Sequence, residues 1–291
     1  MVDQKISAGT YVGKLAERWQ FPSDHLPIGI LIDDLSITSW NVLNSKYMWW
    51  VTKKDSQGLQ NSMLVDEHVY IGKTKLTIRD QHIVELILEM INHPTHPRNI
   101  IGLQECGVPF LKELSSRLPS RFTVIIHGGN GVILDKTLFE IIKECEVKIF
   151  SNEPKRSLQE ILLKEKSTKK TIRLINVHIP GDPTKPSRFE FTHYLADIFD
   201  PEITTIAMGD MNFNELEMKE ALIEPNDYTV YSAYCTNISP YTFYSKAIDH
   251  FIVHSRSLVE LNTPEQVLKG LEQTVELLQF QNFPMHTPPV Y

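Results

Sequence analysis

Short apolar runs that each end in polar residues recur along this chain of 291 residues and limit the folds open to it. Five such runs are ILIDDLSITSWNVL, IIGLQE, FTVIIHGGNGVILD, KKTIRLINVHIP and ITTIAMGDMN. Their apolar parts have the length of buried β-strands. We predict that the first run forms two strands joined by a tight turn at Asp33–Asp34, and that each of the others forms a buried strand.

Helical patterns occur between and after these runs. Residues Arg79 to Asn92 repeat apolar side chains at the spacing of one helical face. A second helix is predicted from Thr263, which can cap it, through Gln279. Strands mixed with helices in this way predict an α/β protein whose sheets are covered by helices. Residues 44–80 are irregular and too long for a simple connection, and we interpret them as a functional loop.

The composition restricts partners and compartment. A formal net charge of −7 and a pI near 5.9 provide no basic surface for tight, nonspecific binding to a nucleic-acid duplex. A nuclease is still compatible with this charge, because a metal site can meet a phosphate locally. The chain has no apolar run long enough to span a membrane, no apolar N-terminal signal segment and no C-x-x-C pair among its three cysteines. We therefore expect a cytoplasmic protein without a membrane span.

Polar residues with catalytic chemistry gather at the ends of the predicted strands. They are Asn41, Glu105, His178, Asp210, Asn212 and Asp249. Carboxylate oxygens suit Mg²⁺ or Mn²⁺, a carboxylate can deprotonate water, and amide and imidazole groups can hold phosphate oxygens. Each residue alone has an ordinary explanation: G-D-x-N is a common turn, and a single histidine is more often structural than catalytic. The six residues together, in this order, are more specific evidence for a catalytic site than any one of them.

The order NVLN (41–44), LQE (103–105), NVHIP (176–180), GDMN (209–212) and AIDHFIV (247–253) resembles the endonuclease/exonuclease/phosphatase superfamily, which has the fold of pancreatic deoxyribonuclease. The resemblance implies one domain over residues 1–291. It also implies a four-layer α/β sandwich, in which two packed mixed β-sheets are flanked by helices.

One segment resembles a particular branch of this superfamily. Residues 232–255, SAYCTNISPYTFYSKAIDHFIVHS, are similar to the deadenylase, or nocturnin-like, branch, in which Ser-Ala-Tyr and Tyr-Thr precede Ile-Asp-Tyr. This chain has His250 at the position of that tyrosine. The Trp-Cys-Asp-Arg-like element of the inositol-phosphatase branch is absent.

The closing motif of the superfamily, Ser-Asp-His, stands at the wrong end of this chain. The C-terminal stretch NFPMHTPPV (282–290) has Met285 where the aspartate belongs, and a thioether is a poor ligand for a hard cation. The N-terminal stretch FPSDHLPI (21–28) matches in full and leads into a predicted strand. We interpret this as a circular permutation, which is physically cheap because chain termini often lie close together. The alternative is a chance P-S-D-H-L-P turn.

The permuted interpretation divides the domain into an N-terminal segment at 1–20, the moved motif and last strand at 21–32, and a C-terminal helix and tail at 256–291. The resemblance then implies roles for the site residues. Glu105 is the principal Mg²⁺ (or Mn²⁺) ligand, with Asp24 nearby, and Asn41 holds phosphate or a water on the metal. Asp210 orients or deprotonates the attacking water, Asn212 and His178 contact the scissile phosphate, and His25, held by Asp249, stabilises the reacting centre.

Three further side chains are candidates for substrate binding. Trp49 and Trp50 can stack bases, although a tryptophan more often packs in a core. Arg188 can contact a phosphate, although a solvated salt bridge is the more ordinary role. We expect His193, His250 and His254 to be packing or surface residues.

Three classes of function are compatible with this sequence. The first is a Mg²⁺-dependent phosphodiesterase or nuclease acting on RNA or single-stranded nucleic acid, such as a 3′ exonuclease, which the segment 232–255 favours. The second is a phosphomonoesterase acting on a small phosphorylated metabolite or lipid headgroup, which the acidic pI permits. The third is an inactive binding module of the same fold, against which the complete set of acid, amide and histidine side chains argues. The sequence leaves substrate identity and oligomeric state open.

Overall fold

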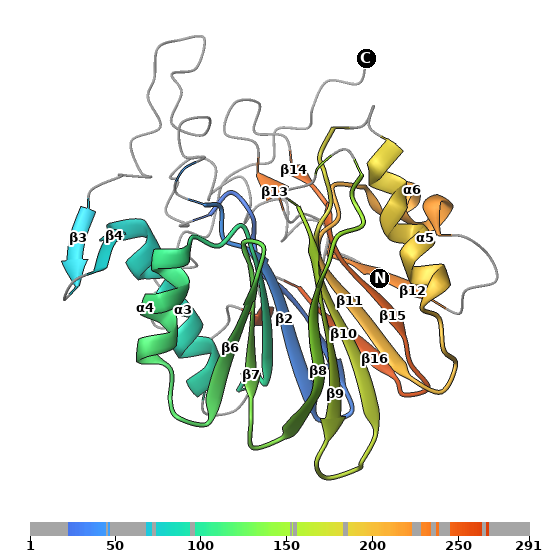
Figure 1. Cartoon of the computed structure of the whole chain (residues 1–291), viewed down its shortest axis with the longest axis horizontal. Helices are drawn as coiled ribbons and strands as arrows, with labels where there is room; N and C mark the ends of the chain where they lie inside the picture. Colours follow the sequence, from blue (N-terminus) through green and yellow to red (C-terminus); the bar gives the residue numbers. More distant parts are fainter. Residues whose placement is uncertain are drawn as a thin grey trace, which may run out of the picture.

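The computed structural model describes most of the region that carries the predicted strands. The described residues are 23–44, 46, 68–71, 74–93, 97–151, 153, 156–182, 186–222, 228–233, 237–238, 245–263 and 266–267. They form two six-stranded sheets and two short hairpins, together with helices (Figure 1). None of the helices among these residues is long and apolar enough to cross a membrane.

The first sheet has the strand order β16-β1-β2-β5-β7-β6. Its strands are β1 (Ile28–Ile32), β2 (Leu35–Asn41), β5 (Ile100–Gln104), β6 (Phe122–His127), β7 (Asn130–Asp135) and β16 (Val259–Asn262). Only β2 and β5 pair in parallel, so the sheet is mixed. The predicted pair of strands joined at Asp33–Asp34 is confirmed: β1 and β2 form an antiparallel hairpin, in which Asp33 adopts a positive φ of 52°.

The second sheet has the order β12-β15-β11-β10-β9-β8. Its strands are β8 (Phe139–Val147), β9 (Leu158–Glu165), β10 (Thr171–His178), β11 (Thr204–Asp210), β12 (Thr229–Ser232) and β15 (Asp249–His254). Again one pair, β10 with β11, is parallel and the others are antiparallel. The two small hairpins are β3 (His68–Ile71) with β4 (Thr74–Thr77), and β13 (Asn237–Ile238) with β14 (Ser245–Lys246).

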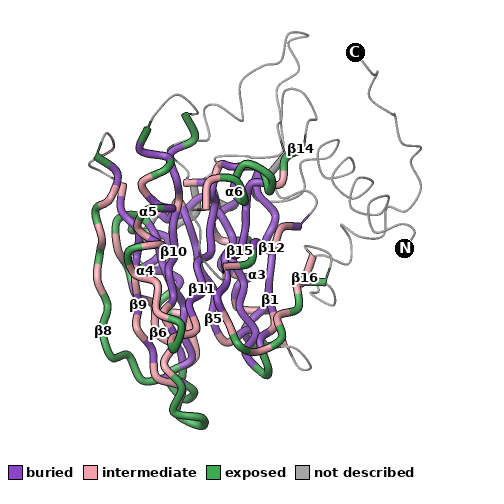
Figure 2. The backbone as a smooth tube through the Cα atoms, turned by 90° about the vertical axis from the view of Figure 1, so that its right-hand side faces the viewer, coloured by how far each residue is buried: buried purple, intermediate pink, exposed green. Residues whose placement is uncertain are grey.

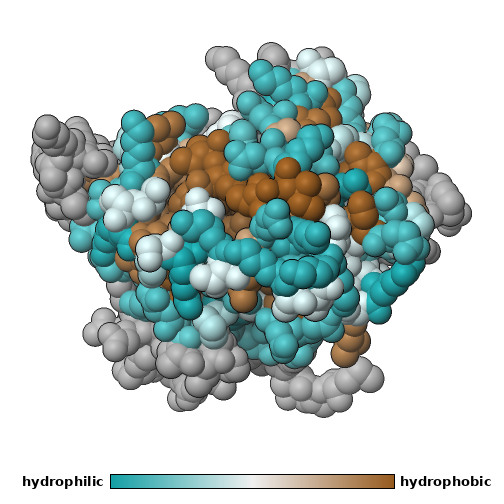
Figure 3. Space-filling view, turned by 60° about the horizontal axis from the view of Figure 1, so that its bottom comes forward, coloured by the Kyte–Doolittle hydropathy of each residue, from teal (hydrophilic) through white to brown (hydrophobic). Residues whose placement is uncertain are grey.

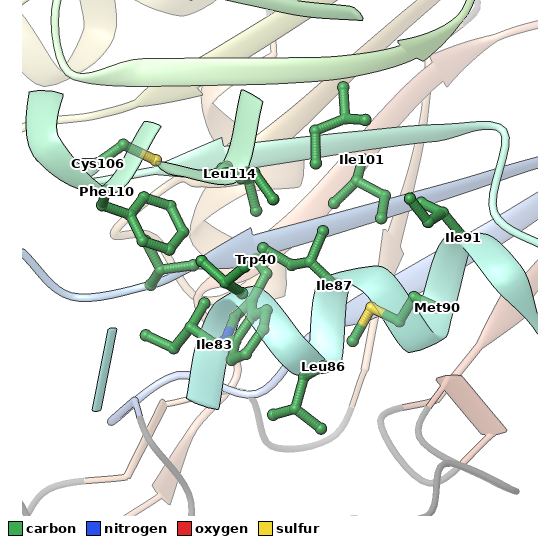
Figure 4. Packing of buried hydrophobic residues seen from close by; sticks show 14 of the residues in the cluster. Trp40, Ile83, Leu86, Ile87, Met90, Ile91, Ile101, Cys106, Phe110 and Leu114 are labelled. Carbon is green, nitrogen blue, oxygen red and sulfur yellow. The ribbon is translucent and has the colours of Figure 1, made fainter. Parts of the chain in front are cut away.

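Helices cover the outer faces of both sheets. They are α3 (Ile78–Asn92), α4 (Val108–Arg117), η2 (Pro186–Phe189), α5 (Glu190–Asp197) and α6 (Glu215–Ala221). The predicted helix at Arg79–Asn92 is confirmed as α3, whose N-cap Thr77 accepts a hydrogen bond from the backbone N–H of Asp80. Figure 4 shows the apolar face of this helix packed on Trp40 and Ile101 of the first sheet.

Three apolar cores correspond to the three interfaces between layers. One lies between the first sheet and α3 with α4, one between the two sheets, and one between the second sheet and α5 with α6. The strands of the interior are accordingly buried along most of their length, whereas the edge strand β8 is largely exposed (Figure 2). The structure is the α/β sandwich of two mixed sheets that the sequence predicted.

Several sequence predictions need correction. The run FTVIIHGGNGVILD is two strands, β6 and β7, because Gly128 and Gly129 adopt positive φ angles and turn the chain between them. The strand β16 lies inside the segment 256–291, which we expected to hold only a helix and a tail. Of the predicted helix from Thr263 to Gln279, only residues 266–267 are described beyond its cap, and they are helical. The expected loop at 44–80 contains the β3–β4 hairpin and the start of α3.

A buried layer of amide side chains joins the two sheets. Asn176 of β10 donates from Nδ2 to the carbonyl oxygens of Leu103, at 3.0 Å, and Gly131, at 3.1 Å, both in the first sheet. Gln104 of β5 donates in return to Asn176 Oδ1, at 2.7 Å. Gln159 of β9 donates to the carbonyl of Ile125, at 2.9 Å. This amide layer, which we define as Gln104, Gln159 and Asn176, fixes how the strands that end in Glu105 and His178 face one another.

Candidate active site

The ends of four central strands meet at one end of the sandwich. Asn41 is paired with Gln104 across β2 and β5, so Glu105 follows directly beside it. His178 and Asp210 are paired across β10 and β11. Asp249 begins the antiparallel strand β15 and is therefore paired with Asp210 at the same end. The strand ends predicted to carry chemistry thus come together from both sheets.

The segment Ser23–Asp24–His25 is fastened to the end of β2. The Ser23 hydroxyl donates to the carbonyl of Asn41, at 2.7 Å, and the Trp40 indole N–H donates to the carbonyl of His25, at 2.9 Å. His25 Nδ1 lies 2.8 Å from Asp249 Oδ2. The sequence predicted a hydrogen bond between these two side chains, and the structure confirms it. The competing candidate, His286, lies outside the described residues.

Asp210 lies at the centre of the cluster. Its Oδ2 accepts a hydrogen bond from Asn41 Nδ2, at 3.1 Å, and lies 3.6 Å from His25 Nε2 and 3.5 Å from His178 Nε2. Its other oxygen accepts from the backbone N–H of Asn212, at 2.9 Å. Two imidazoles and two amide groups therefore surround one carboxylate that is only 3% exposed.

Glu105 is the most open carboxylate of the group. Its Oε1 is 3.3 Å from Asn41 Nδ2 and 3.6 Å from His178 Nε2, and its Oε2 is 3.4 Å from the backbone nitrogen of Asn44. Glu105 also has a φ of 57°, in the left-handed region that non-glycine residues seldom adopt. Such a backbone turns the side chain away from the direction of β5 and toward Asn41.

Glycine at position 209 allows the close approach of β10 and β11 next to Asp210. Gly209 has a φ of 147°, and a Cβ atom built there would lie 1.8 Å from the carbonyl oxygen of Val177. No side chain fits in that space. Asn212 has a φ of 51°, and its Nδ2 donates to the carbonyl of Ile179, at 2.8 Å. The first position of the G-D-M-N motif therefore accepts only glycine.

Burial and mutual charge shift the protonation of this cluster. Burial alone lowers the pKa of His25, but Asp249, Asp210 and Asp24 outweigh it and raise that pKa well above its ordinary value. Burial raises the pKa of Asp210 to about 7; His25 opposes this rise, and Asp249 and Glu105 add to it. Burial lowers the pKa of His178 well below its ordinary range, and Arg156 and His25 add to this effect. The site thus combines a cationic imidazole, a neutral imidazole and a carboxyl that titrates near neutrality.

The donor set fits a hard divalent cation. Burial raises the pKa of Asp24 to about 6, and its Oδ1 is buried without a hydrogen-bond partner among the described residues. Among those residues, no group of three or more His, Cys, Asp or Glu side chains is arranged to hold a metal by itself. Mg²⁺ commonly binds to one or two carboxylates and completes its shell with water and substrate phosphate. Glu105 and Asp24 supply that kind of donor.

Two residues near the site were missed or misjudged from the sequence. Arg156 precedes β9, and its Nη1 lies 3.5 Å and 3.4 Å from the carbonyl oxygens of His178 and Ile179. No sequence pattern distinguished it. Arg188 is only 7% exposed, so the alternative of a solvated salt bridge is wrong. Its guanidinium donates to the carbonyl of Asn212 and lies 4.0 Å from the centre of the Phe213 ring. Trp49 and Trp50 lie outside the described residues.

The other histidines occupy the roles expected of them. His250 is fully buried, and its ring nitrogens contact the Ser232 hydroxyl and the carbonyl of Phe213, each at 2.7 Å. His254 is also buried and packs against the ring of Phe199. His193 is exposed on α5.

Comparisons with known proteins place this arrangement in context. No protein-family model matches the chain, and no curated protein matches it. Solved structures do. An endonuclease/exonuclease/phosphatase family protein from Bacteroides thetaiotaomicron superimposes with a TM-score of 0.54 at 16% identity, over 80% of this chain and 94% of that chain. The chain has the endonuclease/exonuclease/phosphatase fold.

Two other structures with this fold come from proteins whose ligands or activities are known. Mannosyl-6-phosphatase from Bacteroides thetaiotaomicron matches with a TM-score of 0.53 at 17% identity, over 80% of this chain and 96% of that chain. D. rerio TDP2, in complex with a single-stranded DNA product, matches with a TM-score of 0.51 at 14% identity, over 76% of this chain and 84% of that chain.

Proposed function

We propose that this chain is a divalent-metal-dependent hydrolase of phosphoric esters, and that its substrate is a phosphodiester of RNA or single-stranded nucleic acid. The observation that carries the proposal is the convergence of two groups at one rim. Asn41, Glu105 and Asp210 are joined by hydrogen bonds within 3.3 Å, and His25 is held 2.8 Å from Asp249 directly beside them. Structural cores do not need this concentration of charge, because burying it costs stability.

Glu105 and Asp24 are the residues that would hold Mg²⁺ or Mn²⁺. When bound, such an ion neutralises charge on the phosphate and orients it. A bound ion would also give a partner to the buried oxygen of Asp24 that has none within the described protein. The carboxylates of this rim are hard oxygen donors, and such donors prefer a hard cation to a softer metal.

The remaining side chains supply the proton transfer and the charge stabilisation. Asp210, with a pKa raised to about 7, can accept a proton from an attacking water at neutral pH. His25, kept cationic and oriented by Asp249, can stabilise negative charge that develops on the phosphate. Asn41, Asn212 and neutral His178 can donate hydrogen bonds to phosphate oxygens. Every one of these groups is fixed before substrate arrives, so little reorganisation accompanies the reaction.

A nucleic-acid strand is favoured over a small phosphate by what surrounds the rim. Arg156 lies beside His178 and can contact a neighbouring phosphate of the same strand. TDP2, with the same fold, binds a single-stranded DNA product. The deadenylase-like segment 232–255 supports RNA, and Trp49 and Trp50 are proposed to stack on bases beside the scissile phosphate.

A small phosphomonoester is the second candidate. The net charge of −7 suits a compact anionic substrate better than a long polyanion. Mannosyl-6-phosphatase, which shares the fold, is named for a phosphorylated sugar. The two candidates require the same rim and differ in what lies beyond the reacting phosphate.

Circular permutation is proposed as the origin of the motif order. The hairpin of β1 and β2 and the hydrogen bond between His25 and Asp249 are what a moved Ser-Asp-His motif requires. The position of β16 also supports it, because this strand pairs with β1 on the side opposite β2 and comes from the other end of the sequence.

A panel of substrates with and without Mg²⁺ tests the proposal. We expect hydrolysis of single-stranded RNA or DNA to exceed that of sugar phosphates, inositol phosphates and dinucleotide cofactors, and EDTA to abolish it. Glu105→Gln should lower turnover by at least about 100-fold while the melting temperature stays the same or rises. Glu113→Gln, the same change in helix α4, is the matched control. Turnover that survives in Glu105→Gln on every accepted substrate would remove the basis for the assignment.

A further inference from the structure

A buried arginine behind the site holds the loop that contacts Glu105. Arg79 is the second residue of α3 and only 5% exposed. Its Nη1 donates to the carbonyl of Val42, at 2.8 Å, and its Nη2 donates to the carbonyl of Leu43, at 2.6 Å. Nη2 also lies 2.8 Å from Asp80 Oδ1. One guanidinium thus joins the start of a helix to two consecutive peptide groups of the β2 exit loop, residues 42–44.

The position of Arg79 is unfavourable for a purely structural cation. The first turn of a helix carries the positive end of the helix dipole, so a positive side chain there is disfavoured. Burial adds a desolvation cost. Asp80, in the same turn, offsets part of both. What the guanidinium gains in addition is two carbonyl acceptors from residues 42 and 43, and these belong to the loop that leaves Asn41.

The β2 exit loop has a strained backbone that needs such support. Leu43 has a φ of 51°, in the left-handed region that a leucine seldom adopts because its Cβ approaches the following carbonyl oxygen. Its N–H donates to Asn41 Oδ1, at 3.0 Å, which orients the amide so that Nδ2 faces Glu105 and Asp210. The next residue, Asn44, places its backbone nitrogen 3.4 Å from Glu105 Oε2. Each oxygen of Glu105 therefore has a donor from a segment that Arg79 holds.

We propose that Arg79 is a positioning residue that sets the geometry of Glu105 through the β2 exit loop. It touches neither Glu105 nor the reacting phosphate. It keeps Leu43 in its left-handed conformation, and the turn at Leu43 keeps the Asn41 amide and the Asn44 N–H on the two oxygens of Glu105. The inference rests on the proposed function, in which Glu105 holds the divalent ion, and it adds a residue that determines how well the site binds that ion.

Arginine is required here because of its shape. Its planar fork reaches two carbonyls and a carboxylate at once, whereas the single ammonium of lysine cannot bridge the same three acceptors. Loss of groups that orient a metal ligand typically weakens metal binding by 10- to 100-fold. Arg79→Lys keeps the charge and the aliphatic stem and removes the fork, so it isolates the geometric contribution.

The chain offers a closely matched control. Arg98 is also 5% exposed, and its Nη1 donates to the Ser36 hydroxyl, at 2.6 Å. Ser36 lies near the start of β2, at the end of the strand away from Asn41. Arg98→Lys therefore perturbs a buried arginine that contacts the start of β2 without touching the β2 exit loop. The two variants should lose comparable stability.

The experiment is a titration of the full chain with Mn²⁺ alone. Binding is monitored by calorimetry and by the electron paramagnetic resonance signal of the free ion. We expect Arg79→Lys to raise the dissociation constant by about 10-fold or more, and Arg98→Lys to change it by less than about twofold. Asp80→Asn, which removes one anchor of the guanidinium, should have an intermediate effect and provides the test if Arg79→Lys does not fold. Equal Mn²⁺ affinities in the folded Arg79 or Asp80 variant and the wild type would overturn the proposal.

Glu105→Gln separates this inference from the function on which it rests. If Glu105→Gln abolishes Mn²⁺ binding and Arg79→Lys leaves it intact, the positioning role is wrong and the metal site stands. If Glu105→Gln leaves Mn²⁺ binding intact, the metal site itself is wrong.

Discussion

Two polar clusters lie one or two residues apart along β5 and β10, and they are built on opposite principles. The amide layer of Gln104, Gln159 and Asn176 is neutral and buried between the sheets. Its side chains bond to one another, to the Ser39 hydroxyl and to main-chain carbonyls of the opposite sheet, as Asn176 does to Leu103 and Gly131. The rim above it contains carboxylates and imidazoles that bond mainly to one another.

The difference shows where each kind of group can be tolerated. A neutral amide can be buried when fixed protein partners satisfy most of its polar atoms, as they do here except at Gln104 Oε1, so it contributes specificity to the packing of the sheets. A cluster of Asp24, Glu105, Asp210 and Asp249 around His25 retains excess negative charge, which the protein leaves to be balanced from outside. The opposite end of the sandwich carries no comparable cluster among the described residues; Figure 3, with that end turned forward, shows an apolar strip bordered by hydrophilic side chains.

The largest effect that tests this contrast is expected at His25. His25→Ala should lower turnover by about 100-fold or more, because the variant loses a cation that stabilises charge in the transition state. Its free energy of unfolding should fall as well, because the buried Asp249 carboxylate loses the partner that lies 2.8 Å from it. Steady-state kinetics and urea unfolding measure the two quantities.

The control for this prediction is His286, the histidine that would take the place of His25 if the chain were not permuted. His286→Ala should change turnover by less than about twofold, because the motif around it lacks the aspartate. A large loss in His286→Ala combined with normal turnover in His25→Ala would overturn the permuted interpretation.

A change in the amide layer should act on stability, in contrast to a change at Glu105. Asn176→Leu keeps the volume and removes donors to two buried carbonyls and the acceptor for Gln104. We expect a loss of about 2–4 kcal/mol in the free energy of unfolding, because those buried groups would stay unpaired. Glu105→Gln, one residue beyond Gln104, should lose almost none. Urea unfolding of both variants measures the contrast, and a loss below about 1 kcal/mol in Asn176→Leu would contradict it.

The smallest expected effect concerns pH and His250, which belongs to neither cluster. Burial lowers its pKa, and its bond to the Phe213 carbonyl and the charge of Asp249 only partly oppose this. The unfolded state therefore binds the proton more readily, with a pKa of about 6.5. Stability from neutral His250 is complete above that pH and is lost as the pH falls toward the lower folded pKa.

When the pH is lowered from 7 to 5, the free energy of unfolding should therefore fall less in His250→Gln than in the wild type, so its slope against pH should be smaller. The comparison is made on this slope, because the substitution also changes the absolute stability. A steeper slope in the variant would show that His250 gains, and does not lose, proton affinity on folding.

The sequence predicted residues of the site best where a strand end carries them. Asn41, Glu105 and Asp210 each follow a buried apolar run, so the period of the strand and the topology of a sheet bring them to one rim. The pairing of His25 with Asp249, which are 224 residues apart, was predicted only because the motif at 21–28 resembles one that normally closes the chain.

Other residues could not be found this way, for identifiable physical reasons. Arg156 lies in an irregular connection, where no periodicity relates sequence to position. Arg79 occupies a helical turn in which a cation is intrinsically unfavourable, so propensity argues against any special role. Strand β8 escaped prediction because its side chains are mostly exposed and charged, as suits the edge of a sheet.

The pairing of β1 with both β2 and β16 has a consequence during synthesis of the chain. His25 leaves the ribosome 224 residues before Asp249. At 5–20 residues per second that interval is roughly 10–45 s. Throughout it, the hairpin of β1 and β2 exposes the edge to which β16 later adds, and the imidazole lacks its carboxylate. The candidate site of a nascent chain is therefore incomplete until almost the whole described region has been translated, and the unpaired edge of β1 is where such a chain is most exposed to wrong partners.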